Sequence, residues 1–307
     1  MNKIARSAYY LVKPALPRRF QIFLRTREIA AKRNNYTHAW PILQGAAKSP
    51  GGWKGWPEGK KFSLILTHDV ETARGQDRCR RLMEMEKKLG FRSLFNFVPE
   101  RYLVSSKLRG ELQNDGFEVG VHGLNHDGRL FRSQEIFRER SVIINRYLKQ
   151  WNAVGFRAPA MHHNLDWMTA LNIEYDLSTF DTDPFEPQSD GVNTIYPFMV
   201  GSNHLHEGFV EMPYTLPQDF TLFVLMKEKN IEVWRKKLDW IAAAGGMVLV
   251  DTHPDYMNFG DDKTTFEQYP AQNYRELLEY ILAEYNGKYW HVLPKDMAVF
   301  WKAFAKA

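Results

Sequence analysis

The stretch from Phe62 to Glu71, F-S-L-I-L-T-H-D-V-E, decides the fold. A mostly apolar run follows a Gly-Lys-Lys segment and leads directly into ionisable residues, which is the pattern of a buried strand. In α/β folds, ligands bind at the carboxyl ends of the strands. We therefore expect His68, Asp69 and Glu71 where chemistry takes place, although an Asp at this point is equally typical of a turn.

Strand-like and helical segments alternate along the rest of the chain. The clearest helical pattern lies at 136–151, where apolar residues recur every three or four positions. Strands are also expected at 93–98, 117–121, 153–156, 209–212, 247–250 and 289–293, and helices at 77–89, 108–114, 231–241, 274–285 and 297–304. This alternation predicts an α/β fold whose parallel sheet closes, wholly or partly, into a (β/α) barrel. The region 158–226 is poorly periodic.

Composition restricts the class of protein. With 307 residues, 44% of them hydrophobic, the chain has enough apolar material for one large domain or two ordinary ones. A single cysteine, Cys79, excludes an intramolecular disulfide and a multi-cysteine zinc site. Lys13, Pro14 and Pro17 interrupt any apolar segment of a secretory signal. We therefore expect a cytoplasmic location, either free or at the inner face of the membrane.

The positive charge is concentrated at one end of the chain. Residues 1–61 hold 13 Lys or Arg and 2 Asp or Glu, whereas residues 62–307 hold 28 and 34. Residues 1–61 also contain Trp40, Trp53 and Trp56, and such residues usually dock on a core. We therefore expect a basic, Trp-rich N-terminal extension (1–61) packed on a barrel (62–307). The acidic body argues against nucleic-acid binding.

A helix is expected within the extension, at 18–33. Its sequence places apolar residues at helical spacing among several Arg and Lys. One interpretation is an interfacial helix that contacts an anionic membrane peripherally. The other is a helix packed on the body with its basic residues in solvent, which the short apolar face favours.

Two histidines follow the strand expected at 117–121. In V-H-G-L-N-H-D, His122 and His126 fall on the same side if the loop makes one helical turn, with Cβ atoms ~5–6 Å apart. Imidazoles at that spacing can share one metal ion. Together with a carboxylate, they leave coordination positions open, as catalytic zinc sites do.

Two further strand ends carry candidate catalytic residues. Arg157, in G-F-R-A-P, offers a guanidinium that would hold Asp69 ionised and oriented. His253, in V-L-V-D-T-H-P, stands where its pKa can be tuned for proton transfer. Each residue also has a structural interpretation. Arg157 could be a surface residue before a proline kink, and His253 could be a residue that packs in the core. Asp219 is expected to cap a helix or turn.

These four stretches, in this order, resemble the NodB-homology polysaccharide deacetylases, carbohydrate esterase family 4. The family motifs are T-F-D-D, H-[ST]-x-x-H, R-x-P and a His after a late strand. The resemblance covers roughly 62–295. The second motif corresponds to His122 and His126, the third to Arg157 and Pro159, and the last to His253.

The first motif departs from the family pattern. Val70 stands where the family has a second Asp that binds the metal. Some relatives carry a D-x-D or D-x-E form instead, which makes Asp69 the base and Glu71 the ligand. Residues i and i+2 of an extended segment share a face, so this assignment is geometrically reasonable. The alternative is that Asp69 itself binds the metal.

The resemblance implies a metal-dependent hydrolase that removes an N-acetyl group from an amino sugar in a polysaccharide or lipid-linked glycan. It implies a divalent metal, with zinc expected and cobalt, nickel or manganese as alternatives, held by Glu71, His122 and His126. Asp69 would be the base, Arg157 would orient it, and His253 would be the acid. Pro159, His163 and Asp176 are expected to bind the substrate.

Two other functions remain open. One is a metal-dependent amidohydrolase acting on a small non-sugar amide or cyclic imide. The other is a catalytically inactive glycan-binding homologue, for which Val70 is the main argument. Neither the sugar nor the oligomeric state is predicted from the sequence.

Overall fold

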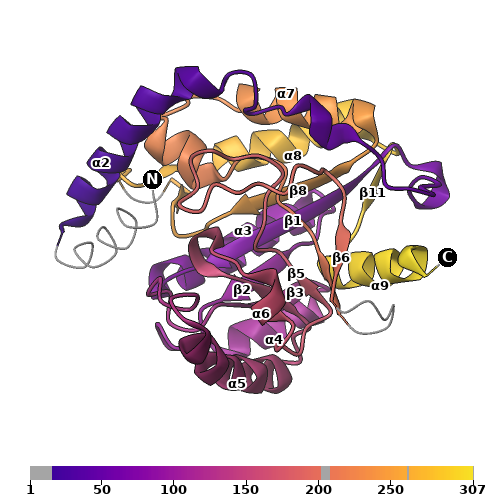
Figure 1. Cartoon of the computed structure of the whole chain (residues 1–307). Helices are drawn as coiled ribbons and strands as arrows, with labels where there is room; N and C mark the ends of the chain where they lie inside the picture. Colours follow the sequence, from indigo (N-terminus) through magenta and orange to yellow (C-terminus); the bar gives the residue numbers. More distant parts are fainter. Residues whose placement is uncertain (1–15, 202–207, 261–262, 307) are drawn as a thin grey trace.

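The computed structural model of the chain describes residues 16–201, 208–260 and 263–306 (Figure 1). The central element is a largely parallel sheet in which β1 pairs with β2, β8 and β11. From β2 the sheet continues through β3, β4, β5 and β7 to β6, which is antiparallel to β7. The strands are β1 (Phe62–Val70), β2 (Leu94–Phe97), β3 (Glu118–His122), β4 (Gly155–Arg157), β5 (Tyr175–Asp176), β6 (Phe198–Val200), β7 (Phe209–Glu211), β8 (Met247–Thr252) and β11 (Tyr289–His291).

The sheet curls until its two ends meet. The backbone N–H groups of Thr215 and Leu216, just after β7, both donate to the carbonyl of Leu249 on β8. These bonds join the β7 side of the sheet to the β8 side and partly close the barrel. The predicted deformed (β/α) barrel is thereby confirmed. Two short strands, β9 (Met257–Asn258) and β10 (Tyr269–Pro270), form a separate parallel pair.

Helices surround the sheet (Figure 1). Three of these helices begin after a polar N-cap residue, namely Thr72, Ser105 or Ser133. Each of these side chains accepts a hydrogen bond from the backbone N–H three residues later. Thr72 starts its helix four residues earlier than the sequence pattern predicts. The helices around the barrel are α3 (Ala73–Lys88), α4 (Ser106–Asn114), α5 (Gln134–Trp151), α6 (Leu165–Met168), α7 (Glu232–Ala244), α8 (Gln272–Tyr285) and α9 (Pro294–Ala305).

The placement of His68 differs from the expectation. It is fully buried, with Nδ1 2.7 Å from Thr252 Oγ1 and Nε2 2.8 Å from Glu86 Oε1 on α3. Successive residues of a strand point to opposite faces of the sheet. Because Asp69 faces the inside of the barrel, His68 faces the helices and takes no part in the site.

The N-terminal segment lies against the barrel. It comprises α2 (Arg18–Lys32) and three short 3₁₀ turns, η2 (Arg33–Tyr36), η3 (Gln44–Ala47) and η4 (Pro57–Gly59). Trp56 donates from Nε1 to the carbonyl of Gly245, and Trp40 packs edge-on against Phe185. Among the described residues, none of the helices is long and apolar enough to cross a membrane.

The poorly periodic region holds the short elements that sequence pattern did not predict. These are β5, β6, α6, a 3₁₀ turn η5 (Pro159–Met161) and a single π-helical segment η6 (Phe220–Leu225). A strand of two or three residues spans too few positions to show an alternating pattern. The strand expected at 209–212 is present as β7.

Candidate active site and metal centre

Strand register brings the site residues together. On the parallel ladder, Asp69 of β1 is level with Asn96 of β2, and His122 of β3 is level with Arg157 of β4. All four residues lie at or near the carboxyl ends of their strands. The sheet therefore gathers segments that are far apart in the sequence at one end of the barrel.

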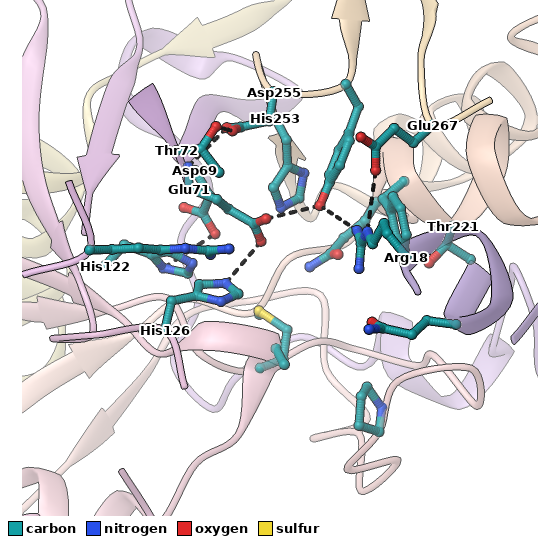
Figure 2. A pocket seen from close by; sticks show the side chains of 18 of the residues that line it. Arg18, Asp69, Glu71, Thr72, His122, His126, Thr221, His253, Asp255 and Glu267 are labelled. Atoms are coloured by element: carbon teal, nitrogen blue, oxygen red, sulfur yellow. Dashed lines mark hydrogen bonds and ion pairs between the residues drawn. The ribbon is translucent and has the colours of Figure 1, made fainter. Parts of the chain in front are cut away.

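Glu71, His122 and His126 form a group that can hold a metal ion. One ligand atom from each lies within 4.8 Å of the others. Nε2 of His126 is 2.9 Å from Glu71 Oε1, and the two side chains are 16% and 15% exposed. Figure 2 shows the two imidazoles side by side, with Glu71 reaching toward His126.

The loop that carries His126 does not make the expected helical turn. His122 ends β3, and the chain then turns back through two residues with left-handed backbone, Gly123 (φ +62°) and His126 (φ +55°). A Cβ on Gly123 would lie 2.5 Å from Pro159 Cδ, so only glycine fits at this turn. The two imidazoles still lie together, with ring centroids 5.2 Å apart, although the loop does not form the helical turn that would have brought them together.

The protonation states of His122 and Glu71 suit a divalent metal. Nδ1 of His122 is 3.1 Å from the backbone carbonyl of Arg157, so it carries the proton and leaves Nε2 unprotonated. Burial and the neighbouring His126 lower the pKa of His122 to about 4, although Asp69 opposes this. Although burial opposes ionisation, His126 holds the pKa of Glu71 well below its usual value. A neutral imidazole and an ionised carboxylate are the metal-binding forms, so His122 and Glu71 fit the expected metal.

Asp69 lies beside this group and is held by two side chains. Its Oδ1 accepts hydrogen bonds from Asn96 Nδ2 (3.0 Å) and Arg157 Nη1 (3.1 Å). Gly120 leaves the space for Asn96, because a Cβ there would lie 2.2 Å from Asn96 Oδ1. Although burial opposes ionisation, Arg157 lowers the pKa of Asp69. Arg157 Nη1 also contacts Asp251 Oδ1 at 2.6 Å.

His253 is held by Asp219, whose role sequence reasoning missed. Nδ1 of His253 is 2.7 Å from Asp219 Oδ1, and Asp219 Oδ2 accepts hydrogen bonds from the His253 backbone and from Tyr269. Although burial favours the neutral ring, Asp219 raises the pKa of His253 well above its usual value. Asp219 also accepts a hydrogen bond from the Phe220 backbone at the start of η6, which is the expected capping role. The only sequence signal was an Asp in the conspicuous stretch 212–219.

Tyr256 and Arg18 were also missed. Tyr256 donates a hydrogen bond to Glu71 Oε2 (2.9 Å), and Arg18 of α2 donates to the Tyr256 hydroxyl (3.2 Å). Arg18 Nε in turn lies 3.2 Å from Glu267 (Figure 2). The N-terminal helix is therefore connected to a candidate metal ligand through a single tyrosine. Nothing in the sequence pattern places residue 18 near residue 71.

The site opens into a cavity of about 790 Å³. Its lining includes Asp69, Glu71, His122, His126 and His253.

The structure does not bring the residues expected to bind the substrate into this lining. Asp176 is fully buried and accepts hydrogen bonds from Ser178, and Pro159 packs beneath Gly123. His163 Nδ1 lies 3.0 Å from the carbonyl of Met161.

The sequence matches no protein-family profile, and a comparison with curated proteins finds no match. Solved structures do match. A protein assigned as a polysaccharide deacetylase in Mycobacterium smegmatis superposes with a TM-score of 0.63, at 17% identity over 83% of this chain and 95% of that one. The chain has the polysaccharide-deacetylase fold.

Two other solved structures are about equally similar. A protein assigned as a polysaccharide deacetylase in Pseudomonas aeruginosa PAO1 has a TM-score of 0.61, at 15% identity over 81% of this chain and 93% of that one. PuuE allantoinase has a TM-score of 0.61, at 15% identity over 81% of this chain and 92% of that one. The fold expected from the resemblance to NodB-homology deacetylases is thus confirmed. Identities this low establish the fold alone.

Proposed function

We propose that this protein is a metal-dependent hydrolase that removes an N-acetyl group from an amino sugar in a polysaccharide or a lipid-linked glycan. One observation carries the proposal. Glu71, His122 and His126 form a group that can hold a metal ion at the cavity surface, with Asp69 and His253 beside it. Two imidazoles and one carboxylate leave room for further ligands, as expected of a catalytic centre.

The metal, for which zinc is expected and cobalt, nickel or manganese are alternatives, would supply Lewis-acid chemistry at the scissile carbonyl. Asp69 is the base that accepts the proton of the attacking water, and its lowered pKa keeps it ionised for this role. Arg157 and Asn96 fix its orientation through the two hydrogen bonds to Oδ1.

His253 is the acid that protonates the departing nitrogen. An amide nitrogen leaves poorly as an anion, so the reaction needs a proton donor. The raised pKa keeps the imidazole protonated, and Nδ1–H donates to Asp219. The second proton, on Nε2, is then the one that is transferred.

Val70 does not argue for an inactive protein. Its side chain is fully buried in the core, while Glu71, the next residue, lies 2.9 Å from His126. The carboxylate missing at position 70 is thus supplied one residue later, as in the D-x-E form of the first motif.

A second candidate is a metal-dependent amidohydrolase that acts on a small non-sugar amide or cyclic imide. The observation that favours it is the likeness to PuuE allantoinase, which matches as well as one of the two deacetylases. A cavity of about 790 Å³ exceeds what a small cyclic amide needs and suits a sugar chain. The glycan deacetylase is therefore the better supported function.

The test is acetate release from an N-acetylated chitooligosaccharide by protein loaded with zinc, cobalt, nickel or manganese. We expect metal-dependent release that Glu71→Gln abolishes. Hydrolysis of allantoin without acetate release would establish the second candidate instead. A protein that holds metal but hydrolyses neither compound would overturn both.

A further inference from the structure

Helix α2 has two opposite apolar faces, although packing on the barrel needs only one. The inner face buries Ile22 and Ile29. On the opposite side of the helix, Phe20, Phe23 and Leu24 are 46%, 52% and 38% exposed. These three residues recur at three- and four-residue spacing, so they form one continuous stripe. The two interpretations left open by the sequence are thus compatible, because the helix packs on the body and also presents an apolar face outward.

The outer stripe combines aromatic rings with guanidinium groups. The rings of Phe20 and Phe23 stack with centroids 6.3 Å apart, and Arg27 lies 5.6 Å from the Phe23 ring. Nearby, Arg19 lies 4.9 Å from the ring of Phe266, which is itself 44% exposed. Aromatic rings flanked by cations are the side chains that enter the interface of an anionic lipid bilayer.

The charges beside the stripe indicate which kind of surface, protein or lipid, would bind it. Of the six Lys or Arg in residues 18–33, Arg18, Lys32 and Arg33 are paired with acidic residues of the protein and Arg25 lines the cavity. Arg19 and Arg27 remain beside the exposed aromatic rings. An apolar protein surface would leave the charges of Arg19 and Arg27 without a complement. A second copy of the chain, whose residues 62–307 are net acidic, would complement the charge and is the alternative that gel filtration tests. An anionic lipid surface matches both the aromatic stripe and the charge.

The inner side of the same helix forms part of the candidate active-site cavity. Arg18 and Arg25 line it, and Arg18 reaches Glu71 through Tyr256 (Figure 2). A smaller cavity of about 270 Å³ shares Arg18 and Arg25 with the first and is lined also by Ile22, Leu24 and Phe185. Leu24 thus belongs both to the outer stripe and to a cavity that adjoins the candidate metal centre.

We propose that α2 docks the protein on an anionic lipid surface through Phe20, Phe23 and Leu24, and that the substrate is a glycan held at that surface. The acetylated sugar would enter beside α2, with any apolar carrier in the smaller cavity. The first part of the proposal, docking on lipid, depends only on helix α2. The second part, a glycan substrate held at that surface, rests on the proposed deacetylase function.

Flotation with lipid vesicles tests the docking half without any catalysis. The full chain is mixed with phosphatidylcholine vesicles that contain or lack phosphatidylglycerol. We expect binding to the anionic vesicles, with at least a ~10-fold loss in the Phe20→Ser/Phe23→Ser double variant and a loss with rising salt. Arg27→Gln should weaken binding to a smaller extent.

The matched control is Val142→Ser. Val142 is 63% exposed on α5, which lies away from α2 in Figure 1, and its replacement should leave vesicle binding unchanged. Circular dichroism melting curves establish that each variant is folded. Wild type that does not bind anionic vesicles, or a double variant that binds as wild type does, would overturn the docking. So would a wild-type dimer in gel filtration that the double variant converts to a monomer without any vesicle binding.

The substrate half is tested with the same acetylated amino sugar supplied free and anchored to vesicles through a lipid. We expect faster acetate release from the anchored form, and the double variant should lose this advantage. Equal rates on the two forms would overturn the substrate half. Acetate release from neither form, with vesicle binding intact, would refute the deacetylase proposal and leave the docking standing.

Discussion

Two groups of acidic residues and histidines lie side by side in this barrel, and both satisfy the same distance criterion for a metal site. The first is Glu71, His122 and His126, and the second is Asp69, Asp251 and His253. In the second group, Arg157 Nη1 already lies 3.1 Å from Asp69 and 2.6 Å from Asp251. The two carboxylates of this group therefore already share a cation supplied by the protein.

The two groups also differ in access. All three residues of the first group line the cavity, whereas Asp251 of the second group is fully buried and does not line it. Burial raises the pKa of Asp251 well above its usual value, although Arg157 opposes this. Proximity of ligand atoms therefore does not define a metal site; the fixed charges nearby and an open path to solvent decide it.

The largest expected effect comes from Asp69, which touches both groups. Asp69→Asn removes the proton acceptor but keeps the shape of the side chain. We expect acetate release to fall by ~10²–10⁴ while the protein keeps its metal. The check is to measure rate and metal content on the same preparation. If Asp69→Asn loses its metal and Glu71→Gln keeps it, the roles of base and ligand are reversed.

The second effect concerns the pH profile. Because Asp219 raises the pKa of His253, the wild-type imidazole stays protonated above its usual pKa, so activity extends to alkaline pH. Asp219→Asn removes the negative charge and should lower that pKa, which moves the alkaline limb of the rate profile to lower pH by at least ~1 unit. The measurement is kcat/KM against pH for both proteins. An unchanged alkaline limb would show that His253 is not the acid.

The smallest effect comes from the link between the extension and the metal ligand. Arg18→Gln should free the Tyr256 hydroxyl that holds Glu71 and weaken metal binding by ~10-fold, in line with other residues that orient metal ligands. Arg19→Gln is the matched control, because Arg19 lies over the exposed Phe266 ring. Equal metal affinity in the two variants would show that α2 does not act on the site.

The contrast between predicted and unpredicted residues has a physical cause. Asp69, His122, Arg157 and His253 each stand at the end of an apolar strand, so a local pattern marks them and strand register brings them together. The barrel followed from the same alternation of strands and helices. The expectation that Asp69 and Glu71 share a face came from their i and i+2 spacing in an extended segment, together with the resemblance to the D-x-E form of the first motif.

Other features depend on contacts between segments that are distant in the sequence, and they produce no local sequence pattern. Asp219 reaches His253 from the start of a π-helical segment, and Arg18 reaches Tyr256 across 238 positions. The expected helical turn between His122 and His126 was wrong because Gly123 adopts left-handed backbone and the chain folds back. The expectation for His68 failed because alternation along the strand places it opposite Asp69.

The most direct test of the account is to measure bound metal after zinc loading in wild type, Glu71→Gln and Asp251→Asn. We predict one zinc ion per wild-type chain, none in Glu71→Gln, and full occupancy in Asp251→Asn. Zinc that survives Glu71→Gln but is lost in Asp251→Asn, or a wild-type chain that holds no zinc, would contradict it.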